Sequence, residues 1–177
     1  MREKFRLSLA SMQSTRTLTQ TAILIALAIV VEYITRPFSG DFLKITFTFL
    51  PFMTICMLFG PFVGMIAGGI IDFIGAIVFY GSVNPLLCVV ELLSGLICGF
   101  LLYQKKSNLW LCILVRFIVC MVLNTILATT ALGVWNGMSI NGFVTLLSTR
   151  ALKNLACFPI EGVLLFFVLK FVNKIVK

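Results

Sequence analysis

Long apolar stretches alternate along the chain with short polar or proline- and glycine-rich segments. A helix needs about 20 largely apolar residues to cross a hydrocarbon layer of roughly 30 Å. Six stretches approach this length, although the second and third are short and are separated only by Gly60 and Pro61. The six predicted spans are residues 18–34, 45–59, 61–80, 85–103, 109–132 and 145–172. The pattern therefore predicts an all-α membrane protein, a bundle of six transmembrane helices.

The composition agrees with a chain that folds in lipid. Of its 177 residues 60% are hydrophobic and only 11% are charged, and the mean hydropathy is +1.12. A soluble domain has a far more polar surface than this composition allows. The short connections leave no room for a soluble domain, so we predict a single domain over residues 1–177.

The basic residues predict the orientation in the membrane, because Lys and Arg accumulate on the cytoplasmic side. The loops on one side hold only Arg36 and Lys44. Nine basic residues fall on the other side: Arg2, Lys4, Arg6, Arg16, Lys105, Lys106, Lys170, Lys174 and Lys177. We therefore predict cytoplasmic termini and a basic cytoplasmic segment over residues 1–16. The apolar run from Leu18 is too long for a signal peptide, so we interpret it as a retained first helix.

Several function classes are disfavoured by what the sequence lacks. The net charge of +8 is explained by topology and does not require a nucleic-acid partner. The chain has no histidine, no GxSxG elbow and no metal-ligand spacing, and its six cysteines lie singly in apolar stretches. We expect neither an enzyme nor a metal or cofactor site. The chain also lacks a GxxxxGK[ST] loop, so we expect no ATP hydrolysis by this chain itself.

Small residues recur at steps of four in the third predicted span and bring one carboxylate onto the same face. The positions are Gly60, Gly64, Gly68, Asp72 and Ala76. Close helix packing replaces the hydrophobic effect inside lipid, so this face is expected to meet another helix. Asp72 then either hydrogen bonds to that helix or contacts a ligand or ion.

Two more polar residues lie at comparable depth in neighbouring spans. Glu91 is about two turns from the outer end of the fourth span, where a carboxylate is costly unless it faces a polar cavity or a partner. Asn124 lies at a similar depth in the fifth span. We interpret both as candidates for ligand binding and Arg116 as structural or interfacial.

The sixth predicted span opens with the strongest polar group in the sequence. Arg150, Asn154 and Glu161 fall on one helical face, and Lys153 lies beside them. A basic residue near the outer mouth with an amide below it suits an anionic organic ligand. Alternatively, Arg150 and Lys153 only extend to the membrane interface.

Aromatic residues gather on the same predicted outer side. They are Tyr33, Phe38, Phe42, Phe47, Phe49, Phe79, Tyr80 and Trp135. Such residues form the ordinary aromatic belt of a membrane protein, and some also suit stacking on a planar heterocycle. Tyr33, Phe47 and Trp135 are our candidates for the second role.

Several stretches together resemble a known family. They are TAILIAL at 21–27, FLKITFTFLP at 42–51, GPFVG at 60–64, DFIGA at 72–76, LSGL at 93–96, LNT at 123–125, and RALKNL at 150–155 with Pro159. They are similar to the S components, the membrane-embedded substrate-binding subunits of energy-coupling factor (ECF) vitamin transporters, and among these to the folate-specific group. The likeness runs through all six predicted spans.

The resemblance implies a six-helix bundle in a bacterial plasma membrane that binds one vitamin near its outer face. It also implies docking on a transmembrane coupling protein with two ATPase subunits, which hydrolyse the ATP. In that family a small-xxx-small pattern on the first helix contacts the coupling protein, and here Ala22 and Ala26 match it. Alanines four apart do allow another helix to approach closely.

Folate is the leading substrate that this resemblance implies. The edge of a pterin can pair with a carboxylate, Glu91 or Asp72, and with the amide of Asn124. Its glutamate tail would then meet Arg150 or Lys153, and the predicted aromatic residues would stack on the ring.

Three alternatives remain. Because the chain departs from the folate-group pattern at residues 82–85 and at Glu161, the substrate is open to another water-soluble vitamin such as pantothenate. A stand-alone secondary transporter would use Asp72, Glu91 or Glu161 as a proton relay. A membrane scaffold without a ligand would leave the outer polar group unexplained.

Overall fold

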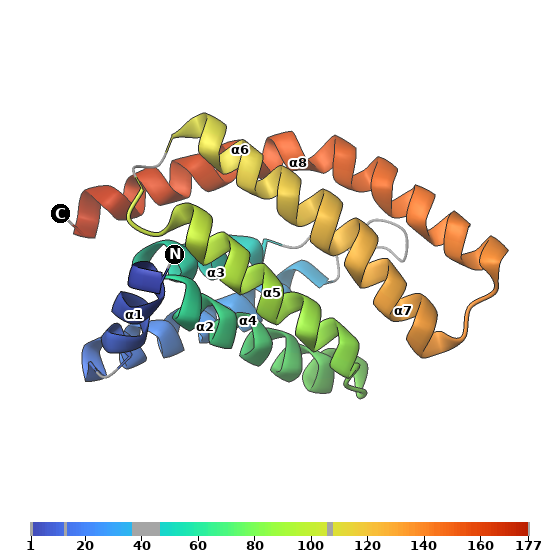
Figure 1. Cartoon of the computed structure of the whole chain (residues 1–177), viewed down its shortest axis with the longest axis horizontal. Helices are drawn as coiled ribbons and strands as arrows, with labels where there is room; N and C mark the ends of the chain where they lie inside the picture. The colour runs from blue at the N-terminus through green and yellow to red at the C-terminus, as the bar shows by residue number, and fades with distance from the viewer. Residues whose placement is uncertain (1, 13, 37–46, 106–107, 177) are drawn as a thin grey trace. The chain divides into compact units, whose positions relative to one another are not determined.

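The structure is a computed structural model that describes residues 2–12, 14–36, 47–105 and 108–176 (Figure 1). The described part of the chain is mainly helical. In chain order the helices are α1 (Arg2–Ser11), α2 (Thr15–Thr35), α3 (Phe49–Phe59), α4 (Pro61–Gly75), α5 (Pro85–Leu102), α6 (Leu109–Ile118), α7 (Ala128–Asn136) and α8 (Ile140–Val176). Two π-helical segments, η2 (Ala76–Tyr80) and η3 (Val119–Leu127), continue α4 and α6 without a break.

Five of the predicted spans appear as helical segments long and apolar enough to cross a membrane. They are Thr15–Thr35, Pro61–Phe79, Pro85–Leu102, Leu109–Asn136 and Ile140–Lys174. The second predicted span differs, because α3 has 11 residues and rises only about 16 Å, and residues 45 and 46 lie outside the described part. The all-helical membrane fold is therefore confirmed, whereas the count of six crossings stays a prediction.

Contacts divide the chain into two compact units, which we describe one at a time. The first contains Met1–Val83 and Glu91–Lys106, and the second contains Asn84–Val90 and Ser107–Lys177. The prediction of a single domain stays a prediction.

Helix α3 lies at the centre of the first unit. Nine of its 11 residues are buried, and it packs against α2 and α4. Ile55 and Phe59 of α3 join Val63 and Ala67 of α4 in one apolar cluster. A helix that is apolar on every side is buried by its neighbours, which explains how so short a helix is stabilised here.

The small-residue face of α4 packs closely on α5, as its spacing predicts. A Cβ atom on Gly68 would lie 2.6 Å from the carbonyl oxygen of Glu91, and one on Gly95 would overlap the carbonyl oxygen of Gly64. Only hydrogen atoms fit between the two backbones at these points. The contact therefore requires glycine on both helices.

The N-terminal segment has a structural role that the sequence analysis missed. Residues predicted only as a basic cytoplasmic segment form α1, which packs against α4. The fully buried hydroxyl of Ser8 donates to the carbonyl of Phe59 (2.6 Å) and accepts from the N–H groups of Phe62 (3.2 Å) and Val63 (3.3 Å). Ser8 thus satisfies backbone groups that have no partner within a helix at the turn between α3 and α4.

In the second unit, the continuous segment α6–η3–α7 runs antiparallel to α8 (Figure 1). Gly162 of α8 faces Ile113 of α6, and Gly133 of α7 faces Phe143 at the start of α8. The sixth predicted span began at residue 145, but α8 begins at Ile140. Ser139 explains this earlier start, because it accepts from Gly142 N through its side chain (3.4 Å) and thus caps the helix.

Candidate ligand-binding site

A buried polar cluster joins three segments of the second unit. It contains Arg116 from α6, Cys120 and Thr125 from η3, and Asn154 and Glu161 from α8. We call these five residues the polar cluster. They lie between apolar neighbours, so each interaction inside the cluster offsets the cost of burying a polar group.

One half of the polar cluster is an ion pair. The guanidinium of Arg116 pairs with the carboxylate of Glu161, and these side chains are only 6% and 16% exposed. The thiol of Cys120 donates to the same carboxylate oxygen at 3.5 Å. This pairing agrees with the interpretation of Arg116 as a structural residue. It also gives the carboxylate of Glu161 a partner of opposite charge.

The other half of the polar cluster is built around the amide of Asn154. Its Nδ2 donates to the carbonyl of Cys120 (3.1 Å) and to Oγ1 of Thr125 (2.8 Å). Thr125 Oγ1 in turn donates to the carbonyl of Cys120 at 2.8 Å. The wide turn of a π-helix displaces backbone carbonyls from regular α-helical partners, and here the side chains of Thr125 and Asn154 bond one of them.

Sequence reasoning placed Asn154 among the ligand-binding residues but did not foresee η3. No proline or glycine interrupts the sequence between Val119 and Leu127, so hydropathy alone predicts an ordinary α-helix. π-helical turns frequently occur at functional sites, which makes η3 an element to note beside the candidate residues.

The two cationic candidates lie on α8 before Asn154. Arg150 and Lys153 are both half-buried, and Arg150 is one turn from Asn154 on the same face. Because α8 begins at Ile140, Arg150 is about 15 Å along the helix from its start. The prediction that the last helix opens with Arg150 was therefore wrong about where the helix begins, whereas the place of Arg150 near the outer mouth stays a prediction.

Two further candidates belong to the same unit. Asn124 lies in η3 next to Thr125 and is half-buried. Trp135 lies near the end of α7, and 55% of its surface is exposed. Neither residue belongs to the polar cluster.

The remaining candidates belong to the first unit. Asp72 on α4 and Glu91 on α5 are half-buried. Tyr33 on α2 is exposed, and its ring lies 6.4 Å from the ring of Phe79. Phe47 is exposed just before α3.

Sequence reasoning missed the polar residues at the end of α2. Glu32 is half-buried and its carboxylate approaches Gly75 of α4. Arg36 lies over the ring of Phe79, 5.2 Å from its centroid, and donates to the carbonyl of that residue at 2.5 Å. A carboxylate four residues before an arginine at the end of an apolar helix was the signal that would have pointed to these two residues, which helical spacing places on one face.

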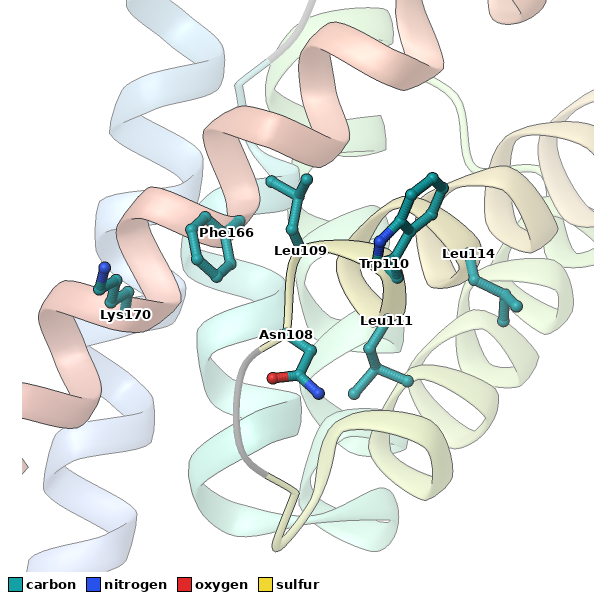
Figure 2. Close-up of a pocket in the computed structure, with 7 residues that line it drawn as sticks. All are labelled: Asn108, Leu109, Trp110, Leu111, Leu114, Phe166 and Lys170. Carbon is teal, nitrogen blue, oxygen red and sulfur yellow. The ribbon is translucent and has the colours of Figure 1, made fainter.

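Some of the predicted residues lie outside the described part of the chain. Phe38, Phe42 and Lys44 all do. The nine ligand-binding candidates divide between the two units. Four of them, including Tyr33, belong to the first unit, and five, including Trp135, belong to the second. The prediction that they line one site stays a prediction. The pocket drawn in Figure 2 is lined by none of the nine.

The predicted partner-binding residues lie on an open face of α2. Ala22 and Ala26 are both exposed, together with Ile23 (62%) and Val30 (53%). Only 11% of the most apolar stretch of α2 is buried, the smallest share among the five candidate spans. An apolar helix with so little covered surface is available to lipid or to another helix.

Comparison with known proteins identifies the family. Residues 16–171 match the model of the ECF transporter substrate-specific component. The folate transporter FolT of Clostridium novyi (strain NT) is 26% identical over 134 residues, which are 75% of this chain and 76% of that protein. A crystal structure of FolT bound with folic acid is 29% identical and superposes with a TM-score of 0.75 over 88% of this chain and 93% of the other. The resemblance seen in the sequence is thus confirmed, and the chain belongs to the substrate-specific components of ECF transporters, which are transport proteins and not enzymes.

Proposed function

We propose that this protein binds folate or a related reduced folate and serves its import. The observation that carries this proposal is the likeness to FolT bound with folic acid, at 29% identity over 88% of the chain. The match to the family model over residues 16–171 includes all the candidate residues. Folate enters from the extracellular side and is delivered inward.

The chemistry of the candidate residues supports this ligand. The two carboxylates of the folate tail match the cations Arg150 and Lys153. The pterin edge offers N–H donors to a carboxylate such as Glu91 or Asp72, and Asn124 supplies an amide. Because both N–H groups of Asn154 are used inside the polar cluster, its carbonyl oxygen is the group that it presents to a ligand.

The same proposal places the chain in a bacterial plasma membrane with six crossings and cytoplasmic termini. Five apolar helical segments and the short helix α3 supply the crossings. The nine basic residues assigned to the cytoplasmic side support the orientation. Helix α3, which has nine buried residues, crosses the membrane surrounded by other parts of the protein.

Titration of the purified protein with folate tests the ligand. The chain has two tryptophans, Trp110 and Trp135, so each single replacement by phenylalanine leaves one reporter. We expect folate to change the fluorescence of Trp135 saturably in the W110F protein, with a matching heat by calorimetry. No heat and no saturable change with folate would overturn the proposal. A response to pantothenate alone would identify another vitamin as the substrate.

Arg150→Gln is expected to weaken folate binding by about tenfold to a hundredfold, the loss typical of one charge-assisted hydrogen bond. Pteroate, which lacks the glutamate tail, should bind the variant and the parent protein equally well. Calorimetry with both ligands measures this difference. The matched control is Lys174→Gln, which removes an exposed cation from the far end of the same helix. An equal loss for folate and pteroate would show that Arg150 does not hold the tail.

The partners in this proposal are a transmembrane coupling protein and two ATPase subunits that supply the energy. The open face of α2 supports this assignment, because its small residues allow a second helix to pack closely. Uptake of folate by cells that lack any coupling module would instead support a stand-alone transporter.

Replacing Ala22 and Ala26 together by leucine is expected to abolish co-purification with the coupling protein, while folate binding stays unchanged. The bulkier side chains hold the partner helix away from α2. Pull-down of the complex from detergent measures the loss. Ala156→Leu on α8 is the control, because Ala156 is also exposed. Retention of the complex by the double variant would show that this face is not the docking surface.

A further inference from the structure

A groove in the second unit is lined by none of the nine candidate ligand-binding residues. It is formed by residues 108–111 and Leu114 at the start of α6, and by Phe166 and Lys170 of α8, and it encloses about 660 Å³. Figure 2 shows Phe166 of α8 beside Leu109, with Lys170 on the far side of Phe166 and with Trp110 and Leu114 on the α6 side. We call this the α6–α8 groove.

The lining of the α6–α8 groove is apolar with a cation at one end. Trp110 is 80% exposed and Leu114 is 51% exposed, so both residues leave much of their apolar surface uncovered. The ammonium of Lys170 lies over the ring of Phe166, 5.6 Å from its centroid. This contact holds the charge at the edge of the groove.

The surroundings of the groove extend this positive charge. Lys174 is exposed one turn beyond Lys170 on the same face of α8. Among the described residues, no acidic side chain lines the groove. A tryptophan beside lysines at the end of an apolar helix is typical of the level of lipid headgroups.

We propose that the α6–α8 groove binds one anionic phospholipid. An acyl chain packs on Leu109, Trp110 and Leu114, and the phosphate accepts hydrogen bonds from the ammonium of Lys170. Charge complementarity selects this occupant, because basic pockets between membrane helices bind anionic headgroups. The groove lies in the cytoplasmic leaflet under the orientation proposed above, and this is the single point at which the inference depends on that proposal.

Quenching of Trp110 by brominated lipids tests the site directly. The W135F protein, with Trp110 as its sole tryptophan, is reconstituted without folate in mixed bilayers of phosphatidylglycerol and phosphatidylcholine, with one lipid brominated at a time. We expect brominated phosphatidylglycerol to quench Trp110 with about fivefold preference over brominated phosphatidylcholine. This is the effect of one lysine at a membrane surface.

Variants of Lys170 separate a specific site from general attraction to a charged membrane. Lys170→Gln should bring the preference for phosphatidylglycerol close to one. Lys170→Arg should keep this preference, and a normal result with Lys170→Arg also shows that the fold tolerates change at this position. Lys105→Gln is the control, because Lys105 is exposed and does not line the groove. Equal quenching by both lipids in the W135F protein would overturn the proposal, as would an equal loss when K170Q and K105Q are added to it. Neither result would bear on folate binding.

Discussion

Glu161→Ala is expected to lower the free energy of unfolding by about 3 to 5 kcal/mol, the cost of breaking a buried ion pair by removing one partner. The guanidinium of Arg116 is only 6% exposed, so it loses its carboxylate in a place where water does not replace it. The melting temperature in detergent measures the effect. A maleimide dye reports the transition, because cysteines such as Cys112 and Cys120 are buried in the folded protein.

The double variant Arg116→Met with Glu161→Leu distinguishes the ion pair from simple packing. Apolar residues of similar volume often replace a buried ion pair at little cost, so the double variant should melt well above Glu161→Ala. If both proteins melt at the same temperature, the loss comes from packing around α8 and not from the charge. A parent-like melting temperature for Glu161→Ala would contradict the prediction outright.

Gly95→Ala is expected to destabilise the protein by about 3 kcal/mol or more, because it overpacks a contact between two backbones. The added Cβ would overlap the carbonyl oxygen of Gly64 and lie 2.8 Å from the Cα atom of Met65. No side-chain rotation relieves either overlap, so α4 and α5 must move apart. The same melting experiment in detergent measures the loss.

Gly142→Ala is the matched control for this prediction. A Cβ atom at Gly142 would meet only Oγ of Ser139, at 3.5 Å, which is an ordinary contact. Since Gly142 lies in the first turn of α8, alanine should leave the melting temperature unchanged or raise it slightly. Equal melting temperatures for G95A and G142A would show that α4 and α5 accommodate the methyl group.

The two predictions rest on interactions that the sequence revealed to different extents. Glycines at steps of four on α4 predicted a close contact with another helix, and the structure places α5 against these glycines. The sequence did not identify Gly95 as the point of closest approach. For the ion pair, Glu161 was noted on the polar face of the last helix, but its pairing with Arg116 was not predicted.

The candidate site was foreseen in its residue types but not in its arrangement. Arg150 and Asn154 were grouped correctly on one face of α8 because helical spacing is a local property. The hydrogen bonds from Asn154 to Cys120 and Thr125 depend on the π-helical turn of η3, which leaves no mark in the hydropathy pattern. Ser8 was likewise hidden, since nothing near it in the sequence points to a turn more than 50 residues away.

The sequence by itself determined that the protein lies in a membrane, which stretches form its long apolar helices, and to which family it belongs. Those properties follow from the sum of hydropathy over about 20 residues, from spacing within one helix, and from conspicuous short stretches. Only the tertiary structure decided that Arg116 meets Glu161, that Asn154 bonds to η3, and that Lys170 borders an apolar groove. The first two contacts join residues 45 and 29 positions apart, and all three arrangements exist because helices pack at particular rotations and depths that no local pattern specifies.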